Sequence, residues 1–155
     1  MTARPYSTIA KGERFTGALT VTETHVVLAA GIFNDPGPNH VNALQAERGR
    51  FGARIAHGPL ILGIADGVLG NAIGATIVAL LDQTARFRRP AFLGDTLVIE
   101  WTVTERTDKP AFGGGGIVGF DGRVRNQDGG VLVELETHLA VGEEAPWSPE
   151  GVGDT

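Results

Sequence analysis

The stretch FNDPGPNHVN, from Phe33 to Asn42, brings together a carboxylate and an imidazole, two side chains that commonly exchange protons in catalysis. Asp35 and His40 stand close in the sequence, and two prolines between them restrict the backbone. The residues alone leave two interpretations open. Asp35 can be an ordinary turn former with His40 in solvent. Alternatively, a rigid loop holds both groups around one water molecule for general acid–base catalysis.

A second candidate is His57-Gly58-Pro59, which is typical of a helix start because proline fits the first turn, where its missing N–H costs little. The free N–H groups and partial positive charge of a helix N-terminus can stabilise an oxygen that gains negative charge during a reaction. Since Pro59 has no N–H, Gly58 is the expected donor. A plain helix start without a chemical role is the alternative.

The residues after this start, Leu60 to Leu69, are apolar nearly all round, which predicts a helix buried on most sides. Small residues recur along it, and we expect them to let strands approach the helix backbone closely. These residues are Gly63, Ala65, Gly67 and Gly70.

Most of the remaining sequence predicts strands. Their composition and turn signals place them at Phe15–Val21, Ala75–Arg89, Asp95–Glu105, Gly116–Asn126 and Gly130–Val141. Because the later strands follow one another without helical crossovers, we expect an antiparallel sheet and the α+β class. The nearly all-round apolar helix suggests that this sheet wraps around it.

Two further helices are predicted before the apolar one. The first covers Thr22–Phe33 with Thr22 as its N-cap, and the second is a short polar helix over Asn42–Phe51. The stretch FNDPGPNHVN between them is predicted to be a loop, because its prolines forbid a continuing helix.

Composition limits the possible classes of protein. The 155 residues suit one domain over residues 15–141, with an N-terminal segment over 1–14 and a disordered tail over 142–155. The net charge of -5 disfavours nucleic-acid binding. The longest apolar stretch contains Asp66, Asn71 and glycines, so no membrane span is expected. The first residues lack a signal peptide's apolar run and the chain has no cysteine, which is compatible with the cytoplasm.

Other motifs carry weaker functional signals. The run Gly113–Gly116 lacks the lysine and hydroxyl residue of a phosphate-binding P-loop, so it reads as a strand connection. His25 and His138 have no ligand spacing to a partner, and no dedicated metal site is expected. The basic residues of ARFRRP either decorate an exposed strand end or contact the phosphates of a ligand; they are Arg86, Arg88 and Arg89.

Taken in order, the segments FTGALTVTETHVV, FNDPGPNHVN, FGARIAHG and ARFRRPAFLGDTL resemble the MaoC-like dehydratases, hot-dog-fold relatives of the (R)-specific enoyl-CoA hydratases. The resemblance covers about residues 15–141. The family motif is similar to G-D-x-N-P-x-H-x-D, and the matching letters here are N-D-P-G-P-N-H-V-N. The family's catalytic pair falls on Asp35 and His40, and its proline on Pro38. Gly37 replaces the usual asparagine, and Asn42 replaces the frequent acid.

The resemblance implies hydration of a 2-enoyl thioester, or the reverse dehydration, without a cofactor. Asp35 and His40 would deprotonate a water that attacks C3, and the Gly58 N–H would polarise the thioester carbonyl. His57, Gly37 and Asn42 are the expected substrate contacts near the acyl group, and Arg86, Arg88 or Arg89 would meet phosphate. The implied partners are a CoA or acyl-carrier-protein thioester and a second copy of the chain, in a homodimer or a dimer of dimers.

Two other functions remain open on the sequence. A thioesterase with the same fold would hydrolyse the acyl thioester, because fold alone does not determine chemistry. A non-catalytic acyl-CoA-binding protein would hold the ligand without turnover.

Overall fold

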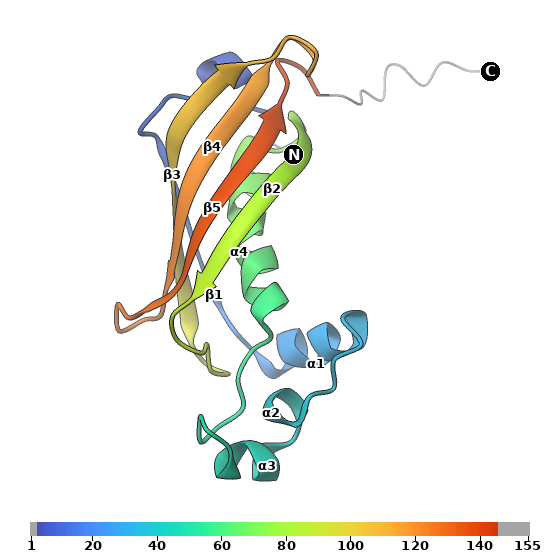
Figure 1. Cartoon of the computed structure of the whole chain (residues 1–155), viewed down its shortest axis with the longest axis vertical. Helices are drawn as coiled ribbons and strands as arrows, with labels where there is room; N and C mark the ends of the chain where they lie inside the picture. Colours follow the sequence, from blue (N-terminus) through green and yellow to red (C-terminus); the bar gives the residue numbers. More distant parts are fainter. Residues whose placement is uncertain (1–2, 146–155) are drawn as a thin grey trace, which may run out of the picture.

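The computed structural model describes residues 3–145 as one sheet with helices on a single side of it (Figure 1). The strands are β1 (Arg14–Thr20), β2 (Ile77–Phe87), β3 (Thr96–Asp108), β4 (Gly116–Arg125) and β5 (Val131–Val141). They lie in the order β1-β3-β4-β5-β2, and every neighbouring pair is antiparallel. The predicted α+β class and antiparallel sheet are therefore confirmed. Within the described part of the chain, no helix is long and apolar enough to cross a membrane.

The long helix α4 (Gly58–Ile73) packs along the inner face of this sheet (Figure 1). One side chain per turn is buried, which gives the helix a stripe made of Ile61, Ala65, Leu69 and Ile73. Alternate residues of β3 are buried in the same core: Leu97, Ile99, Trp101 and Val103. The Trp101 indole N–H donates a hydrogen bond to the Ala65 carbonyl at 2.8 Å. This packing positions the first residues of α4 at the edge of the core.

The prediction that the glycines of α4 let strands approach the helix backbone closely was wrong. Gly63, Gly67 and Gly70 are exposed, and a Cβ atom added to any of them would meet nothing within 4 Å. The close approach depends instead on a strand glycine, because a Cβ on Gly17 of β1 would lie 2.7 Å from the Val68 side chain. Within one chain, α4 is therefore buried on its sheet side and open along its glycine side.

Helix α1 (Glu23–Ile32) begins where the sequence predicts. Thr22 is its N-cap, and a capping box links the Thr22 and His25 side chains to each other's backbone N–H groups. Val26 and Ala29 are the buried residues of this helix. The capping box gives His25 a structural role.

The loop prediction for FNDPGPNHVN was wrong over four residues, since Pro38–Val41 forms the short helix α2. Pro38 is compatible with this turn because it stands at the helix N-terminus, where no N–H is needed. Helix α3 (Ala43–Arg48) follows directly, as the sequence predicts. Helices α1, α2 and α3 lie together beyond the N-terminal end of α4, outside the span of the sheet (Figure 1).

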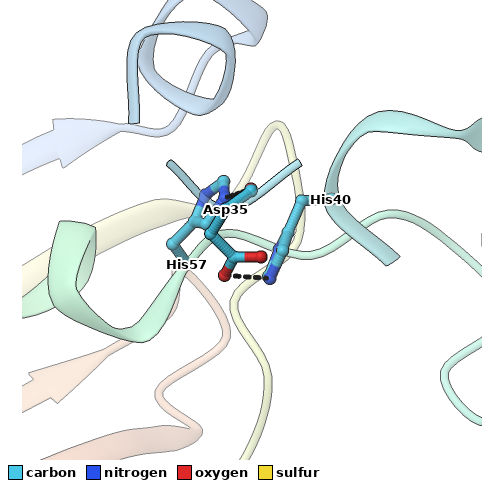
Figure 2. A group of neighbouring side chains, drawn as sticks. All are labelled: Asp35, His40 and His57. Atoms are coloured by element: carbon cyan, nitrogen blue, oxygen red, sulfur yellow. Dashed lines mark hydrogen bonds and ion pairs between the residues drawn. The ribbon is translucent and has the colours of Figure 1, made fainter. Parts of the chain in front are cut away.

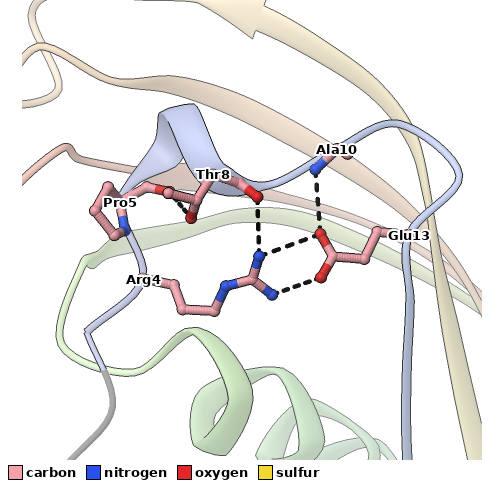
Figure 3. A network of polar contacts seen from close by, with 5 residues as sticks. All are labelled: Arg4, Pro5, Thr8, Ala10 and Glu13. Carbon is pink, nitrogen blue, oxygen red and sulfur yellow. Dashed lines mark hydrogen bonds and ion pairs between the residues drawn. The ribbon is translucent and has the colours of Figure 1, made fainter.

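A polar network links residues within the N-terminal segment (Figure 3). The Arg4 guanidinium contacts the Glu13 carboxylate at 2.6 Å and, by donating hydrogen bonds to it, lowers the pKa of Glu13. The same carboxylate accepts a hydrogen bond from the Ala10 N–H at 3.1 Å. Tyr6 and Ile9 are buried in the main core. The expected domain bounds stay a prediction, and most of the expected tail, residues 146–155, lies outside the described residues.

Candidate active site

Asp35 follows α1 at a point where the chain reverses direction. Asn34 has a positive φ of 51°, a conformation that asparagine adopts more readily than most residues. The Asp35 oxygen Oδ1 accepts a hydrogen bond from the Gly37 N–H at 3.1 Å, as in an ordinary turn. The other oxygen, Oδ2, faces His40, and the side chain is 54% exposed (Figure 2). The same carboxylate therefore forms the turn and faces the imidazole.

The His40 imidazole comes from α2 and is oriented by a backbone carbonyl. Its Nδ1 lies 2.8 Å from the Ile55 oxygen, and because a carbonyl oxygen only accepts, Nδ1 must carry the proton. The lone pair of the neutral ring is then on Nε2, which lies 3.8 Å from Asp35 Oδ2. This distance is too long for a direct hydrogen bond and suits one bridging water. A base and a carboxylate can thus share one solvent molecule.

His57 is in contact with both Asp35 and His40 and is only 1% exposed. Its ring stacks on the His40 ring with the centroids 3.8 Å apart. The Phe33 ring packs edge-on against the His57 ring, with the centroids 5.9 Å apart. The His57 Nε2 lies 3.0 Å from the Asp35 carbonyl oxygen, so Nε2 is the donor (Figure 2). His57 therefore contacts both members of the pair, and its burial leaves no surface for the direct substrate contact that the resemblance implied.

Asp35, His40 and His57 each offer a possible metal-ligand atom, and these atoms lie within 4.8 Å of one another. The two imidazole rings are stacked 3.8 Å apart and their planes differ by only 19°, so their in-plane lone pairs lie in two separate, nearly parallel planes. Such lone pairs do not converge on a single ion in the way that tetrahedral or octahedral coordination requires. The geometry therefore favours an acid–base site over a metal centre.

The N-terminal end of α4 lies next to the same cluster. His57 is the N-cap, and Gly58 and Pro59 begin the helix, as the sequence predicts. The first N–H groups of a helix have no partner within it, and Pro59 has none to offer. Gly58 is partly exposed, so its N–H can meet a ligand.

A cavity of about 390 Å³ connects the base with this helix end. His40 and Gly58 both line it, together with apolar side chains that include Ile61, Phe87 and Leu132. Cavities with mostly apolar walls and a few convergent polar groups are typical of small-molecule sites. The predicted catalytic residues are therefore close in space, and two of them open onto one apolar cavity.

The three predicted arginines are divided between two surfaces. Arg88 and Arg89 line the cavity that holds His40, whereas Arg86 lines a different depression with Glu100 and Glu134. Arg88 also forms an ion pair of 2.6 Å with Glu134, and this hydrogen-bonded partner lowers the pKa of the Glu134 carboxyl.

Sequence reasoning missed Arg50, which lines the same cavity and lies 5.9 Å from the centre of the Phe51 ring. The available signal was a basic residue beside an aromatic one just before FGARIAHG. That signal is weak because nothing in the local sequence connects Arg50 with the distant His40 cavity.

Gly37 and Asn42 have structural contacts here. A Cβ atom at Gly37 would lie 3.0 Å from the Asp35 Oδ1 atom, so this position leaves little room beside the carboxylate. The Asn42 side chain accepts a hydrogen bond from the Gln45 N–H at 3.0 Å and thereby caps α3. Asn42 does not line the His40 cavity.

Asp66 and His138, which lie outside this cluster, have shifted pKa values. Burial raises the pKa of Asp66 on α4, although its hydrogen bond from Gln83 acts in the opposite direction. The pKa of His138 is raised chiefly by its hydrogen bond to Asp82, with Glu105 also contributing. The His138 contacts join β5 to its neighbour β2 and, across β4, to β3, so they are structural.

Comparison with known proteins agrees with this arrangement. Residues 6–112, more than half of the chain, match the family described as "MaoC like domain". The chain is 34% identical over 99 residues to an (R)-specific enoyl-CoA hydratase of Rhodospirillum rubrum, covering 64% of this chain and 69% of that protein. It is also 34% identical over 85 residues to a 3-hydroxybutyryl-CoA dehydratase of Methylorubrum extorquens, covering 55% of this chain and 54% of that relative.

A solved structure extends the similarity to the whole fold. The R-hydratase PhaJ1 of Pseudomonas aeruginosa, in its unliganded form, superimposes with a TM-score of 0.82 at 30% identity, and the match covers 97% of each chain. The arrangement of the strands and the central helix is thus shared. The chain therefore belongs to the MaoC-like family and has the hot-dog fold that its sequence resemblance implied.

Proposed function

We propose that this hydratase/dehydratase adds water to 2-enoyl-CoA thioesters, or removes it from 3-hydroxyacyl-CoA thioesters, by means of Asp35 and His40. The observation that carries the proposal is the 3.8 Å gap between His40 Nε2 and Asp35 Oδ2, beside the cavity that His40 and Gly58 line. The names of the two curated relatives support a 2-enoyl-CoA or 3-hydroxyacyl-CoA substrate.

In the hydration direction, a water between these two side chains loses a proton to His40 Nε2 while Asp35 orients it. The water oxygen bonds to C3 as the electrons of the C2=C3 bond move towards the carbonyl. The negative charge then collects on the thioester oxygen, where the Gly58 N–H stabilises it. The proton is delivered to C2 as the carbonyl re-forms, so one water is added and the thioester remains intact.

The substrate carrier is expected to be an acidic, phosphate-bearing group. Arg50, Arg88 and Arg89 line the cavity and can pair with phosphate oxygens of CoA or of a carrier-protein pantetheine. A cytoplasmic location stays a prediction.

The experiment that tests the function follows the ultraviolet absorbance of the conjugated thioester when a short 2-enoyl-CoA is mixed with the protein. Hydration removes this absorbance without releasing a thiol. Release of free CoA would instead indicate a thioesterase, and tight binding without either change would indicate a non-catalytic binder.

His57 is expected to act as a positioning residue, because it bonds the Asp35 carbonyl and stacks on His40. His57→Phe keeps a ring under His40 but loses the donor, whereas His57→Gln keeps a donor of similar reach and loses the ring. We expect each variant to lower kcat by up to about 10²-fold with little change in KM, since the reacting groups are displaced. Steady-state kinetics on correctly folded variants provides the check. A raised KM with an unchanged kcat would instead support direct contact between His57 and substrate.

The second copy of the chain is expected to pair along β2, which forms one edge of the sheet. Val78, Leu80 and Leu81 are exposed on this strand, and an open apolar edge is a site of association unless it is covered. The exposed glycine side of α4 would let a second helix approach closely. Both surfaces support a homodimer.

We expect Leu80→Arg to weaken this dimer at least about tenfold, because it places a charge in the apolar contact. Light scattering coupled to gel filtration measures the mass at several concentrations. Leu19→Arg on β1, the opposite edge, is the matched control and should leave the mass unchanged. A wild-type protein that remains monomeric at all concentrations would contradict the homodimer.

A further inference from the structure

The Asn39 side chain occupies the space that a side chain at position 37 would need. Its Oδ1 atom lies 3.0 Å from where a Cβ on Gly37 would stand. Its Nδ2 atom lies 3.2 Å from His40 Nε2, the nitrogen that faces Asp35. The chain thus has glycine at position 37, where the family motif usually has asparagine. It has an asparagine at position 39, whose side chain extends into the space next to Gly37.

The orientation of this carboxamide follows from the hydrogen bonds of His40. Since the Ile55 carbonyl requires the proton on Nδ1, His40 Nε2 can only accept in the neutral ring. Asn39 must then direct its NH₂ group at Nε2 and its Oδ1 atom towards Gly37. Among the described residues, His40 is the only hydrogen-bond partner of the Asn39 side chain.

A carboxamide is suited to this position because it can serve both protonation states of His40. Before water binds, Nδ2–H donates to the single lone pair of the unprotonated Nε2 and holds the ring plane, and the reacting water must replace this hydrogen bond before Nε2 can take its proton. Once Nε2 has taken a proton it becomes a donor, and rotation of the amide presents Oδ1 as the acceptor. An alanine offers neither group, and an aspartate would offer only acceptors next to the Asp35 carboxylate.

We propose that Asn39 is a positioning residue for His40 and supplies, from position 39, the carboxamide that the family motif supplies from position 37. The proposal rests on the proposed function for its kinetic readout. Asn39 is exposed, and within residues 3–145 its side chain has no other hydrogen bond.

The decisive comparison is between Asn39→Ala and the double variant Gly37→Asn/Asn39→Ala. We expect Asn39→Ala to lower kcat about tenfold with KM little changed, the equivalent of one ordinary hydrogen bond lost from the reacting state. The double variant should recover most of the loss, because the new carboxamide enters the space vacated at position 39. Gly37 has a φ of -50°, so a side chain there imposes no backbone strain.

Gln45→Ala, which truncates another exposed amide nearby on α3, is the control and should keep wild-type kcat. A Cβ at position 37 would also lie 3.0 Å from Asp35 Oδ1, so Gly37→Ala/Asn39→Ala, which adds the same Cβ without a carboxamide, is the matched reference for the double variant. The proposal is overturned if Asn39→Ala keeps kcat within about twofold of wild type, or if Gly37→Asn/Asn39→Ala is no faster than this reference.

A second measurement does not depend on turnover. The ¹⁵N chemical shift of His40 Nε2 should change in Asn39→Ala and return towards the wild-type value in the double variant. An unchanged shift in the single variant would overturn the proposal even if no enoyl thioester is hydrated. Failure of the wild type to hydrate any enoyl thioester, with the shifts behaving as expected, would overturn only the proposed reaction.

Discussion

Asp35→Asn and His40→Ala are each expected to lower kcat/KM for enoyl-CoA hydration by about 10²- to 10⁴-fold, the range of a positioned acid–base group. Asp35→Asn is informative because the new side chain still has an Oδ1 atom to accept the Gly37 N–H. The variant therefore keeps the turn and removes the charge that faces His40. A purely turn-forming Asp35 would tolerate this change.

Single-turnover and steady-state rates, measured on variants with wild-type unfolding temperatures, check this expectation. Asp128→Asn, at the exposed turn between β4 and β5, is the control variant. It also removes one carboxylate and should leave the rates unchanged. Hydration by Asp35→Asn or His40→Ala at the rate of Asp128→Asn would contradict the assigned acid–base pair.

Gly58→Pro is expected to lower kcat by about 10²- to 10³-fold, the usual effect of removing one donor to a developing oxyanion. Proline removes the N–H while its preferred φ suits the start of a helix. His57 already has φ -64° and ψ 140°, the conformation that a residue before proline prefers. We therefore expect α4 to form while its donor is absent.

Gly58→Ala separates loss of the donor from added bulk. Both variants place a Cβ atom 3.1 Å from Phe87, so both require that ring to shift slightly. Only the alanine variant retains the N–H. Equal rates for the two variants would show that the donor has no role and that crowding by the new side chain explains any loss.

The residues that could be predicted are those whose role is local. Thr22 was recognisable as an N-cap, and His57-Gly58-Pro59 as a helix start, because capping and proline preferences act within one turn. The apolar residues that alternate along the predicted strand Asp95–Glu105 are also the ones that enter the core, including Trp101. The residues alone left Asp35 and His40 open between an ordinary turn and an acid–base pair, and the structure places Asp35 Oδ2 3.8 Å from His40 Nε2.

Roles that depend on distant segments could not be predicted. Nothing beside His57 in the sequence indicates that its ring stacks on His40, because that contact requires α2 to fold back over the start of α4. The glycines of α4 have a spacing that suits close packing. The spacing alone does not show whether the close neighbour is a strand of the same chain or a second copy of the chain. The structure places the close strand contact at Gly17 and leaves the helix glycines open.

The short helix α2 illustrates a competition between local signals. Helix α1 ends at Ile32, before Pro36 and Pro38, and Pro38 provides a favourable first residue for one new turn. That turn places Asn39 and His40 on one side of the site. The prolines therefore forbid a continuing helix and also permit a new one, and only the first effect was predicted.

The most direct test of the central claim is to mix the wild-type protein with a short trans-2-enoyl-CoA and analyse the product by mass spectrometry alongside a free-thiol assay. The account predicts a 3-hydroxyacyl-CoA, heavier than the substrate by one water, with no thiol released and with its formation nearly abolished in Asp35→Asn. Free CoA as the product, or equal hydration by the wild type and Asp35→Asn, would contradict it.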